Sequence, residues 1–182
     1  KEGVAVDLFT HYPNLSTLDS LVQDAISGHA FDAIVQPVAT RKKKLLVADM
    51  ESTMVDVECL DELAKYVGLE EKISAITERA MNGELDFEAA LRERVALLKG
   101  LPETTLQEVM DEKVKPMPGA LALMRAMKAN GAYTLMVTGG FDFFAEKVKT
   151  MLGFDEVRAN RLEIAGGKLT GNVIPPILDK NA

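Results

Sequence analysis

The sequence has a single cysteine, Cys59. One thiol cannot form an internal disulfide or a metal site built from several thiolates, so the cysteine content fits a reducing compartment. No uninterrupted apolar run approaches the roughly 20 residues that a membrane-spanning helix needs. The chain also lacks a basic-then-apolar leader at its start. The sequence therefore predicts a cytoplasmic protein with no membrane partner.

Basic residues are in the minority, because 21 Lys and Arg stand against 28 Asp and Glu, for a net charge of −7. A nucleic-acid binder needs a basic face that displaces counterions, so this balance argues against general nucleic-acid binding. With 182 residues, 47% hydrophobic and 27% charged, the chain is typical of one globular domain with room for an inserted subdomain. The chain starts without Met and stops without a closing helix or strand. We therefore expect a fragment of a longer protein.

Residues 1–40 predict a β-α-β segment. Residues 4–9 and 31–38 have the composition of strands, and Ser16 is the expected N-cap of a helix that ends at Gly28. The segment is too small to fold alone. We expect it to resemble part of an ACT-like domain, which binds amino acids or forms dimers.

The remaining residues alternate between strand and helix patterns. Residues 44–48 are a continuous apolar run, which predicts a central parallel strand buried on both faces. Helical spacing then predicts four short helices within residues 56–116, which would form an inserted cap. The fourth of these is expected to begin at Pro102, and the next helix, after the cap, at Pro118.

The second half of the predicted core contains three strands. One is expected over residues 133–137, followed by a helix that ends near Leu152. Two more are expected on either side of Gly166-Gly167, a pair typical of a two-residue hairpin turn. The order of elements predicts an α/β fold with a parallel sheet, whose core comprises residues 41–55 and 117–182.

Two polar motifs follow the first and second predicted core strands. Ligands of parallel sheets bind beyond the carboxyl ends of the strands. Asp49 and Glu51 are two positions apart, so in extended chain both face the same cavity. Such a pair needs a hard cation or a shared proton, and phosphoryl transfer uses this arrangement with Mg²⁺. The second motif, Thr138-Gly139-Gly140, offers a hydroxyl and unhindered N–H groups for phosphate oxygens.

Each motif has an ordinary interpretation when it is taken alone. An acidic pair in a strand-end turn is more often a capping or solvated pair, and Thr-Gly-Gly could be a tight turn into a helix. The conjunction of both motifs with a helical insert directly after the first is what favours a site.

The residues around these motifs carry a family resemblance. Residues 46–55 resemble the first motif of the haloacid dehalogenase superfamily, Asp-x-Asp-x-Thr. Other segments resemble the phosphoserine phosphatases within that superfamily: 58–64, 80–83, Phe87, 91–98, 137–141 and 159–162. The resemblance runs from about Lys43 to Ala182. It implies a Rossmann-like parallel sheet with a four-helix cap, truncated at the C-terminus.

The resemblance also implies an activity, the Mg²⁺-dependent hydrolysis of O-phospho-L-serine to L-serine and phosphate, which is the last step of serine biosynthesis. Asp49 would attack phosphorus to give an aspartyl-phosphate. Glu51 would protonate the serine oxygen and then deprotonate the hydrolytic water. Mg²⁺ would be held by Asp49, the backbone carbonyl of Glu51 and a later Asp.

The resemblance further assigns the residues that surround the substrate. The phosphate would contact Ser52, Thr138 and Gly139; the ammonium would contact Glu58 and the carboxylate Arg94; Met81 and Phe87 would shield the site. Without the family, Met81 and Phe87 would pass as core, Arg94 as a surface charge and Glu58 as an acid that favours the helix dipole.

Three departures from the family pattern matter. Position 51 is Glu where the family has Asp, and position 138 is Thr where Ser is more usual. The chain also ends before the family's phosphate-binding Lys and its later metal-binding loop. We therefore expect this chain alone to be inactive.

Two alternative functions stay open at this point. One is a phosphatase for another small phosphate ester, and the other is a non-catalytic regulatory relative, which Glu51 motivates. A homodimer also stays open.

Overall fold

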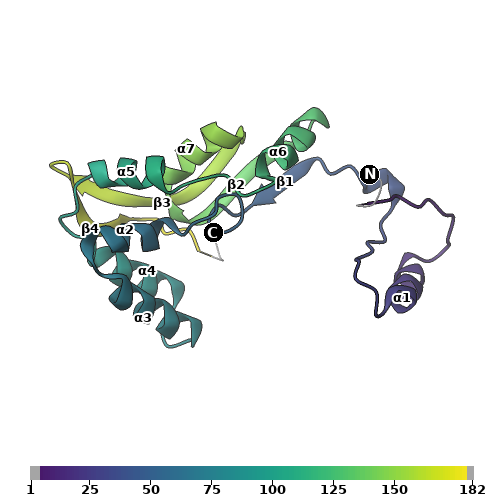
Figure 1. Ribbon diagram of the computed structural model, residues 1–182, viewed down its shortest axis with the longest axis horizontal. Helices are drawn as coiled ribbons and strands as arrows, with labels where there is room; N and C mark the ends of the chain where they lie inside the picture. Colours follow the sequence, from purple (N-terminus) through teal and green to yellow (C-terminus); the bar gives the residue numbers. More distant parts are fainter. Residues whose placement is uncertain (1–4, 180–182) are drawn as a thin grey trace. The chain divides into compact units, whose positions relative to one another are not determined.

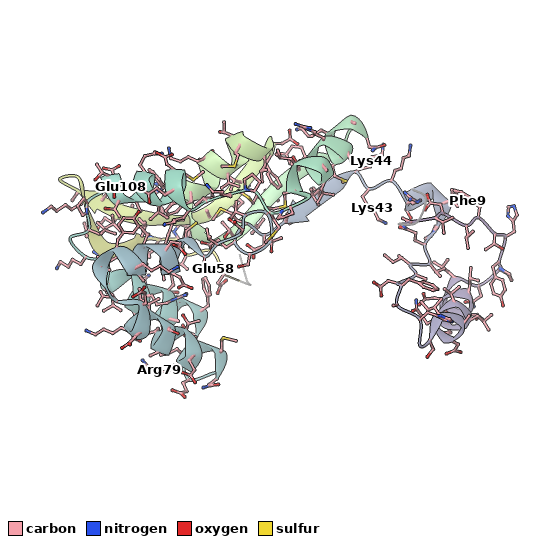
Figure 2. All side chains as sticks on the ribbon, viewed as in Figure 1. Phe9, Lys43, Lys44, Glu58, Arg79 and Glu108 are labelled. Carbon is pink, nitrogen blue, oxygen red and sulfur yellow. The ribbon has the colours of Figure 1, made fainter. Side chains whose placement is uncertain are left out.

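The computed structural model describes residues 5–179. The chain divides into two compact units between Lys43 and Lys44, both labelled in Figure 2. The N-terminal unit contains helix α1 (Leu15–Ile26) and the short 3₁₀ helix η1 (Val38–Thr40). Within this unit, the Arg41 guanidinium donates hydrogen bonds to both carboxylate oxygens of Asp7, each at 2.7 Å.

The predicted β-α-β segment is wrong for the described residues of this unit, because only its helix forms. No strand is present between residues 5 and 43, and Val4, which began the first predicted strand, lies outside the described range. A strand needs a partner for its N–H and C=O groups and a core for its apolar face. Neither is available here: along its described length α1 buries no residue, and the side chains of Leu8 and Ile34 are 87% and 84% exposed.

Three predicted helix starts are each displaced by two residues. Helix α1 is capped by Asn14, whose side-chain oxygen accepts the Thr17 N–H at 3.0 Å, and not by Ser16. An Asn that accepts this bond satisfies an otherwise orphaned donor, which fixes the earlier start. Helix α5 (Thr104–Glu112) and helix α6 (Ala120–Ala129) begin two residues after Pro102 and Pro118, with Glu103 and Gly119 as their N-cap residues.

The second unit is built on a four-stranded sheet. The strands are β1 (Leu45–Ala48), β2 (Tyr133–Phe141), β3 (Glu156–Ala165) and β4 (Lys168–Ile174), in the order β1-β2-β3-β4 (Figure 1). The first three strands are parallel, and β4 pairs antiparallel with β3. The predicted hairpin turn is confirmed, since Gly166 and Gly167 have φ angles of 58° and 72°, the left-handed values that a type I′ turn requires.

The four helices predicted between residues 56 and 116 are present. They are α2 (Cys59–Val67), α3 (Glu70–Met81), α4 (Phe87–Ala96) and α5 (Thr104–Glu112). Helices α3 and α4 lie on the opposite side of the sheet from α7 (Asp142–Leu152), and α6 and α7 pack against β2 (Figure 1). The fold is therefore the predicted α/β fold. The proposed bounds of core and cap, 41–55 with 117–182 and 56–116, stay a prediction.

The interior packs between the sheet and its helices. Its largest fully buried side chains include Phe141, Phe144, Met50, Leu63 and Met136. The expectation that residues 44–48 form a central strand is wrong in this chain, because β1 lies at the edge of the sheet and pairs only with β2 among the described strands. Its alternate side chains Leu45 and Val47 are each 54% exposed.

In the described part of the chain, no helix combines the length and apolar character needed to cross a membrane.

Candidate active site

A cavity of about 290 Å³ opens where β1 and β2 end. Seven of the nine predicted site residues line it: Asp49, Glu51, Glu58, Phe87, Arg94, Thr138 and Gly139. The structure therefore brings together the two strand-end motifs and residues of the helical insert, which are far apart in the sequence. The other two predicted residues, Ser52 and Met81, do not line the cavity.

Asp49 is the first residue after β1. One of its carboxylate oxygens accepts a hydrogen bond from the Met50 N–H at 2.7 Å. Met50 is fully buried, and its side chain anchors the turn that follows the strand in the core. The nucleophile candidate is therefore a solvent-accessible carboxylate on a fixed backbone.

Thr138 and Gly139 lie within β2, not in a loop after it as the sequence predicted. The strand continues to Phe141 because its pairing with β3 resumes at Asn160 after an irregular stretch from Val137. Within that stretch the Thr138 hydroxyl accepts the Gly140 N–H at 3.0 Å. Residues 138–140 therefore lie outside the regular pairing with β3, and all three line the cavity.

Glu51 is half-buried, and one of its carboxylate oxygens accepts the Cys59 N–H, the first N–H of helix α2, at 2.7 Å. Burial raises the pKa of Glu51 to about 7, and the charges of Glu58 and Asp49 add to the rise, while the bond from Cys59 opposes it. A carboxyl group with such a pKa can both donate and accept a proton near neutrality. Burial, with the nearby Glu51, also raises the pKa of the Cys59 thiol, which keeps it protonated and unreactive.

Ser52 is the one described non-glycine residue with a left-handed backbone, at a φ of 50°. Its hydroxyl donates a hydrogen bond to a Glu58 carboxylate oxygen at 2.7 Å. Glu58, labelled in Figure 2, precedes the first turn of α2, and its side chain makes no capping hydrogen bond to that helix. The Ser52 contact therefore holds the Glu58 carboxylate on the cavity side of the helix start.

Helix α4 supplies the apolar and cationic side of the cavity. Phe87 begins the helix, and its ring lies about 3.0 Å from where a Cβ on Gly139 would be. Arg94 is half-buried, with its Nε donating to the Ala90 carbonyl at 3.3 Å. Met81, at the end of α3, is 84% exposed and takes no part in the lining.

Sequence reasoning missed five lining residues: Leu60, Asp61, Thr77, Leu91 and Phe141. Leu91 could have been found, because it lies four residues after Phe87 and three before Arg94, which places all three on one helix face. Asp61 and Thr77 carried no such signal, since their positions depend on how the helices pack.

The donor set for a cation is incomplete in the described residues. They contain no group of three or more His, Cys, Asp or Glu side chains arranged to hold a metal ion. Asp49 and the backbone carbonyl of Glu51 are hard oxygen donors of the type that Mg²⁺ takes. These residues could thus supply part of a coordination shell.

The sequence profile of the haloacid dehalogenase-like hydrolases matches residues 46–181. The chain belongs to this family. A phosphoserine phosphatase from Archaeoglobus fulgidus is 45% identical over 150 residues, which cover 81% of this chain and 43% of that protein. The phosphoserine phosphatase of Methanocaldococcus jannaschii is 42% identical over 142 residues, covering 78% of this chain and 67% of that protein.

The solved structures agree with these relatives. A phosphoserine phosphatase in the form of a phospho-aspartyl intermediate analogue superposes with a TM-score of 0.67 at 43% identity, covering 73% of this chain and 63% of that one. The resemblance to phosphoserine phosphatases is thus confirmed in sequence and in fold. The chain spans 43% of the length of the Archaeoglobus relative and 67% of the Methanocaldococcus one, so it corresponds to part of such a protein.

Proposed function

We propose that the protein is a phosphoserine phosphatase, which hydrolyses O-phospho-L-serine through an aspartyl-phosphate. The observation that supports this most is that a single cavity is lined both by Asp49, Thr138 and Gly139 and by Glu58 and Arg94. The reaction would be the last step of serine biosynthesis in the cytoplasm.

The strand-end residues suit the phosphate group. Asp49 is accessible for attack on phosphorus, and the Thr138 hydroxyl and the Gly139 backbone can hold phosphate oxygens. Glu51 can give its proton to the departing serine oxygen and then take one from water. The relative solved as a phospho-aspartyl intermediate analogue supports the covalent step.

The cap residues suit the amino-acid head group. Phosphoserine carries an ammonium and a carboxylate, and the cavity presents Glu58 for the first and Arg94 for the second. The planar guanidinium of Arg94 matches a carboxylate with two parallel hydrogen bonds. A phosphate ester without an amino-acid head would not need this pair of opposite charges.

Mg²⁺ is the proposed cofactor. Four carboxylates line the cavity, those of Asp49, Glu51, Glu58 and Asp61, against the single guanidinium of Arg94. A dianionic phosphate is repelled by such a surplus unless a cation offsets it. Asp49 and the Glu51 carbonyl would hold the ion, which would neutralise charge on the transferring phosphoryl group.

The test is phosphate release from O-phospho-L-serine by the full-length protein, with and without Mg²⁺. Turnover that needs Mg²⁺ and is abolished by Asp49→Asn is the expected result. An Arg94→Met variant should raise KM for phosphoserine but leave turnover of a phosphate ester without a carboxylate unchanged.

Two other results would redirect the assignment. Turnover of other small phosphate esters but not of phosphoserine would favour a different substrate on the same fold. No turnover of any ester would favour a non-catalytic relative, which the Glu at position 51 would then explain.

A further inference from the structure

The Glu51 carboxyl group lies between helix α2 and strand β2. On the helix side, one oxygen accepts the Cys59 N–H at 2.7 Å. On the strand side, a Cβ at position 140 would lie 2.6 Å from the other oxygen, Oε2, and 3.1 Å from Cδ. Gly140 is buried, so the carboxyl group occupies the space that a side chain at this position would fill.

Backbone conformation does not account for the glycine at position 140. Its φ lies outside the left-handed range, unlike those of ten other described glycines. A residue with a Cβ at this position would not have to enter the left-handed region. Space for the neighbouring carboxyl group is therefore the feature that a glycine provides here.

We propose that Gly140 is a positioning residue for Glu51: the missing side chain leaves room for the longer acid, whose carboxyl group is held against the first N–H of helix α2. Glu is one methylene longer than the Asp of the family pattern, about 1.5 Å of extra reach. The extra length is taken up in the gap at Gly140. An alanine there would push the carboxyl group away from Cys59.

The Thr138 hydroxyl is a second neighbour that an alanine at position 140 would contact. The same Cβ would lie 3.2 Å from the Thr138 hydroxyl oxygen, which also accepts the Gly140 N–H. Replacing Glu51 by Asp withdraws the carboxyl group and leaves Thr138 in place. A double-mutant cycle between positions 51 and 140 therefore isolates the contact with Glu51.

The experiment uses four forms of the 182-residue chain: the natural sequence, Gly140→Ala, Glu51→Asp and the double variant. The readout is hydrogen exchange and the ¹H–¹⁵N signal of the Cys59 amide, which need no activity. We expect Gly140→Ala to speed Cys59 exchange by about tenfold or more when Glu51 is present, since the hydrogen bond from the Cys59 N–H to the Glu51 carboxyl group is lost. In the Glu51→Asp background the same substitution should change exchange by less than about twofold.

Gly139→Ala is the matched control for this readout. Its Cβ would meet the ring of Phe87, not Glu51, so the Cys59 amide should keep its signal. The amides of helix α6, none of whose residues lines the cavity, report whether each variant is folded. The proposal is overturned if Gly140→Ala leaves Cys59 exchange unchanged, or changes it equally in both backgrounds.

The consequence for catalysis rests on the proposed function. In the full-length protein, Gly140→Ala should lower kcat for phosphoserine by about tenfold when Glu51 is present and by less than about twofold in the Glu51→Asp background. Equal losses in the two backgrounds would contradict a positioning role. Absence of turnover in the natural sequence would count against the proposed function, while Cys59 exchange would still decide the role of Gly140.

Discussion

At the scale of single residues, Glu51 stands where the Asp-x-Asp-x-Thr motif that this chain resembles has Asp. One oxygen of its carboxyl group accepts a hydrogen bond from the Cys59 N–H, and burial is the main cause that raises its pKa to about 7. The raised pKa suits a proton donor, but the position is set by a side chain longer than the family's Asp. The raised pKa should therefore increase the rate of proton transfer, whereas the altered position of the carboxyl group should decrease it.

We expect Glu51→Asp to raise kcat of the full-length protein on phosphoserine. A misplacement of about 1 Å can cost on the order of 10²-fold, and Asp restores the shorter reach, so a gain of about tenfold is expected. Glu51→Gln, which keeps the size but cannot transfer a proton, should be slower than both. Steady-state phosphate release measures all three, and a Glu51→Asp enzyme no faster than the natural one would rule out misplacement.

Asp155 is a residue whose charge contributes to stability away from the site. Its carboxylate accepts hydrogen bonds from Lys128, from the Thr134 N–H at 2.8 Å and from the Thr134 hydroxyl at 2.9 Å. The Lys128 bond, followed by those from Thr134, lowers the pKa of Asp155 from 3.8 to about 2. The folded state therefore favours the ionised carboxylate more than the unfolded chain does.

This shift predicts a pH dependence with a definite sign. Because the folded pKa is depressed, the stabilisation is fully present above pH 3.8 and is lost as the pH falls towards 2. Asp155→Asn should therefore lower the unfolding midpoint in urea at about pH 6, with a smaller difference from the natural chain near pH 2. Lys128→Met should show part of the same loss. A difference that stays constant between the two pH values would contradict the assignment.

At the scale of elements, Asn160 joins β3 to two neighbours. It is 1% exposed, and its amide nitrogen donates to the Gly139 carbonyl at 2.9 Å. Its amide oxygen accepts the Leu178 N–H at 2.7 Å. The irregular end of β2 and the segment after β4 are thus held by one buried side chain.

Replacing Asn160 by Ala should destabilise the chain by about 1–3 kcal/mol, because the Gly139 carbonyl and the Leu178 N–H lose their hydrogen-bond partner. Asn172→Ala is the matched control: this β4 residue is exposed, its amide nitrogen donates to Glu163 at 2.9 Å, and its loss should cost less than about 0.5 kcal/mol. Urea unfolding of the three chains makes the comparison. An equal loss of unfolding free energy for the two substitutions would show that the burial of Asn160 does not increase its contribution to stability.

The helices of the insert and the hairpin could be predicted from the sequence because their signals are local. Gly68 ends α2 in a left-handed conformation, and the Asp86 side chain caps α4 by accepting the Ala89 N–H. Most of the site could also be predicted, since strand ends converge in a parallel sheet. The edge position of β1 and the course of β2 through Gly139 could not, because both depend on pairing with distant strands.

At the scale of the whole chain, the N-terminal residues show where local pattern fails. Strand-like composition between residues 31 and 38 produced no strand in the described structure, since composition does not supply a partner. Helix α1 did form, because its cap and periodicity lie close together along the chain. A strand, which needs a partner from elsewhere in the chain, is thus harder to predict from one sequence than a helix, whose signals are local.

The charge of the whole cavity leads to the last prediction, that the 182-residue chain alone turns over phosphoserine poorly. Four carboxylates face one guanidinium in the lining, and the described residues offer no group of three side-chain ligands for a cation that would offset them. Losing one stabilising group in a phosphoryl-transfer site costs on the order of 10²-fold or more. We therefore expect the purified chain with Mg²⁺ to be at least about 10²-fold slower than the phosphoserine phosphatase of Methanocaldococcus jannaschii assayed beside it. Comparable rates of phosphate release would show that the acidic cavity is already neutralised within these residues.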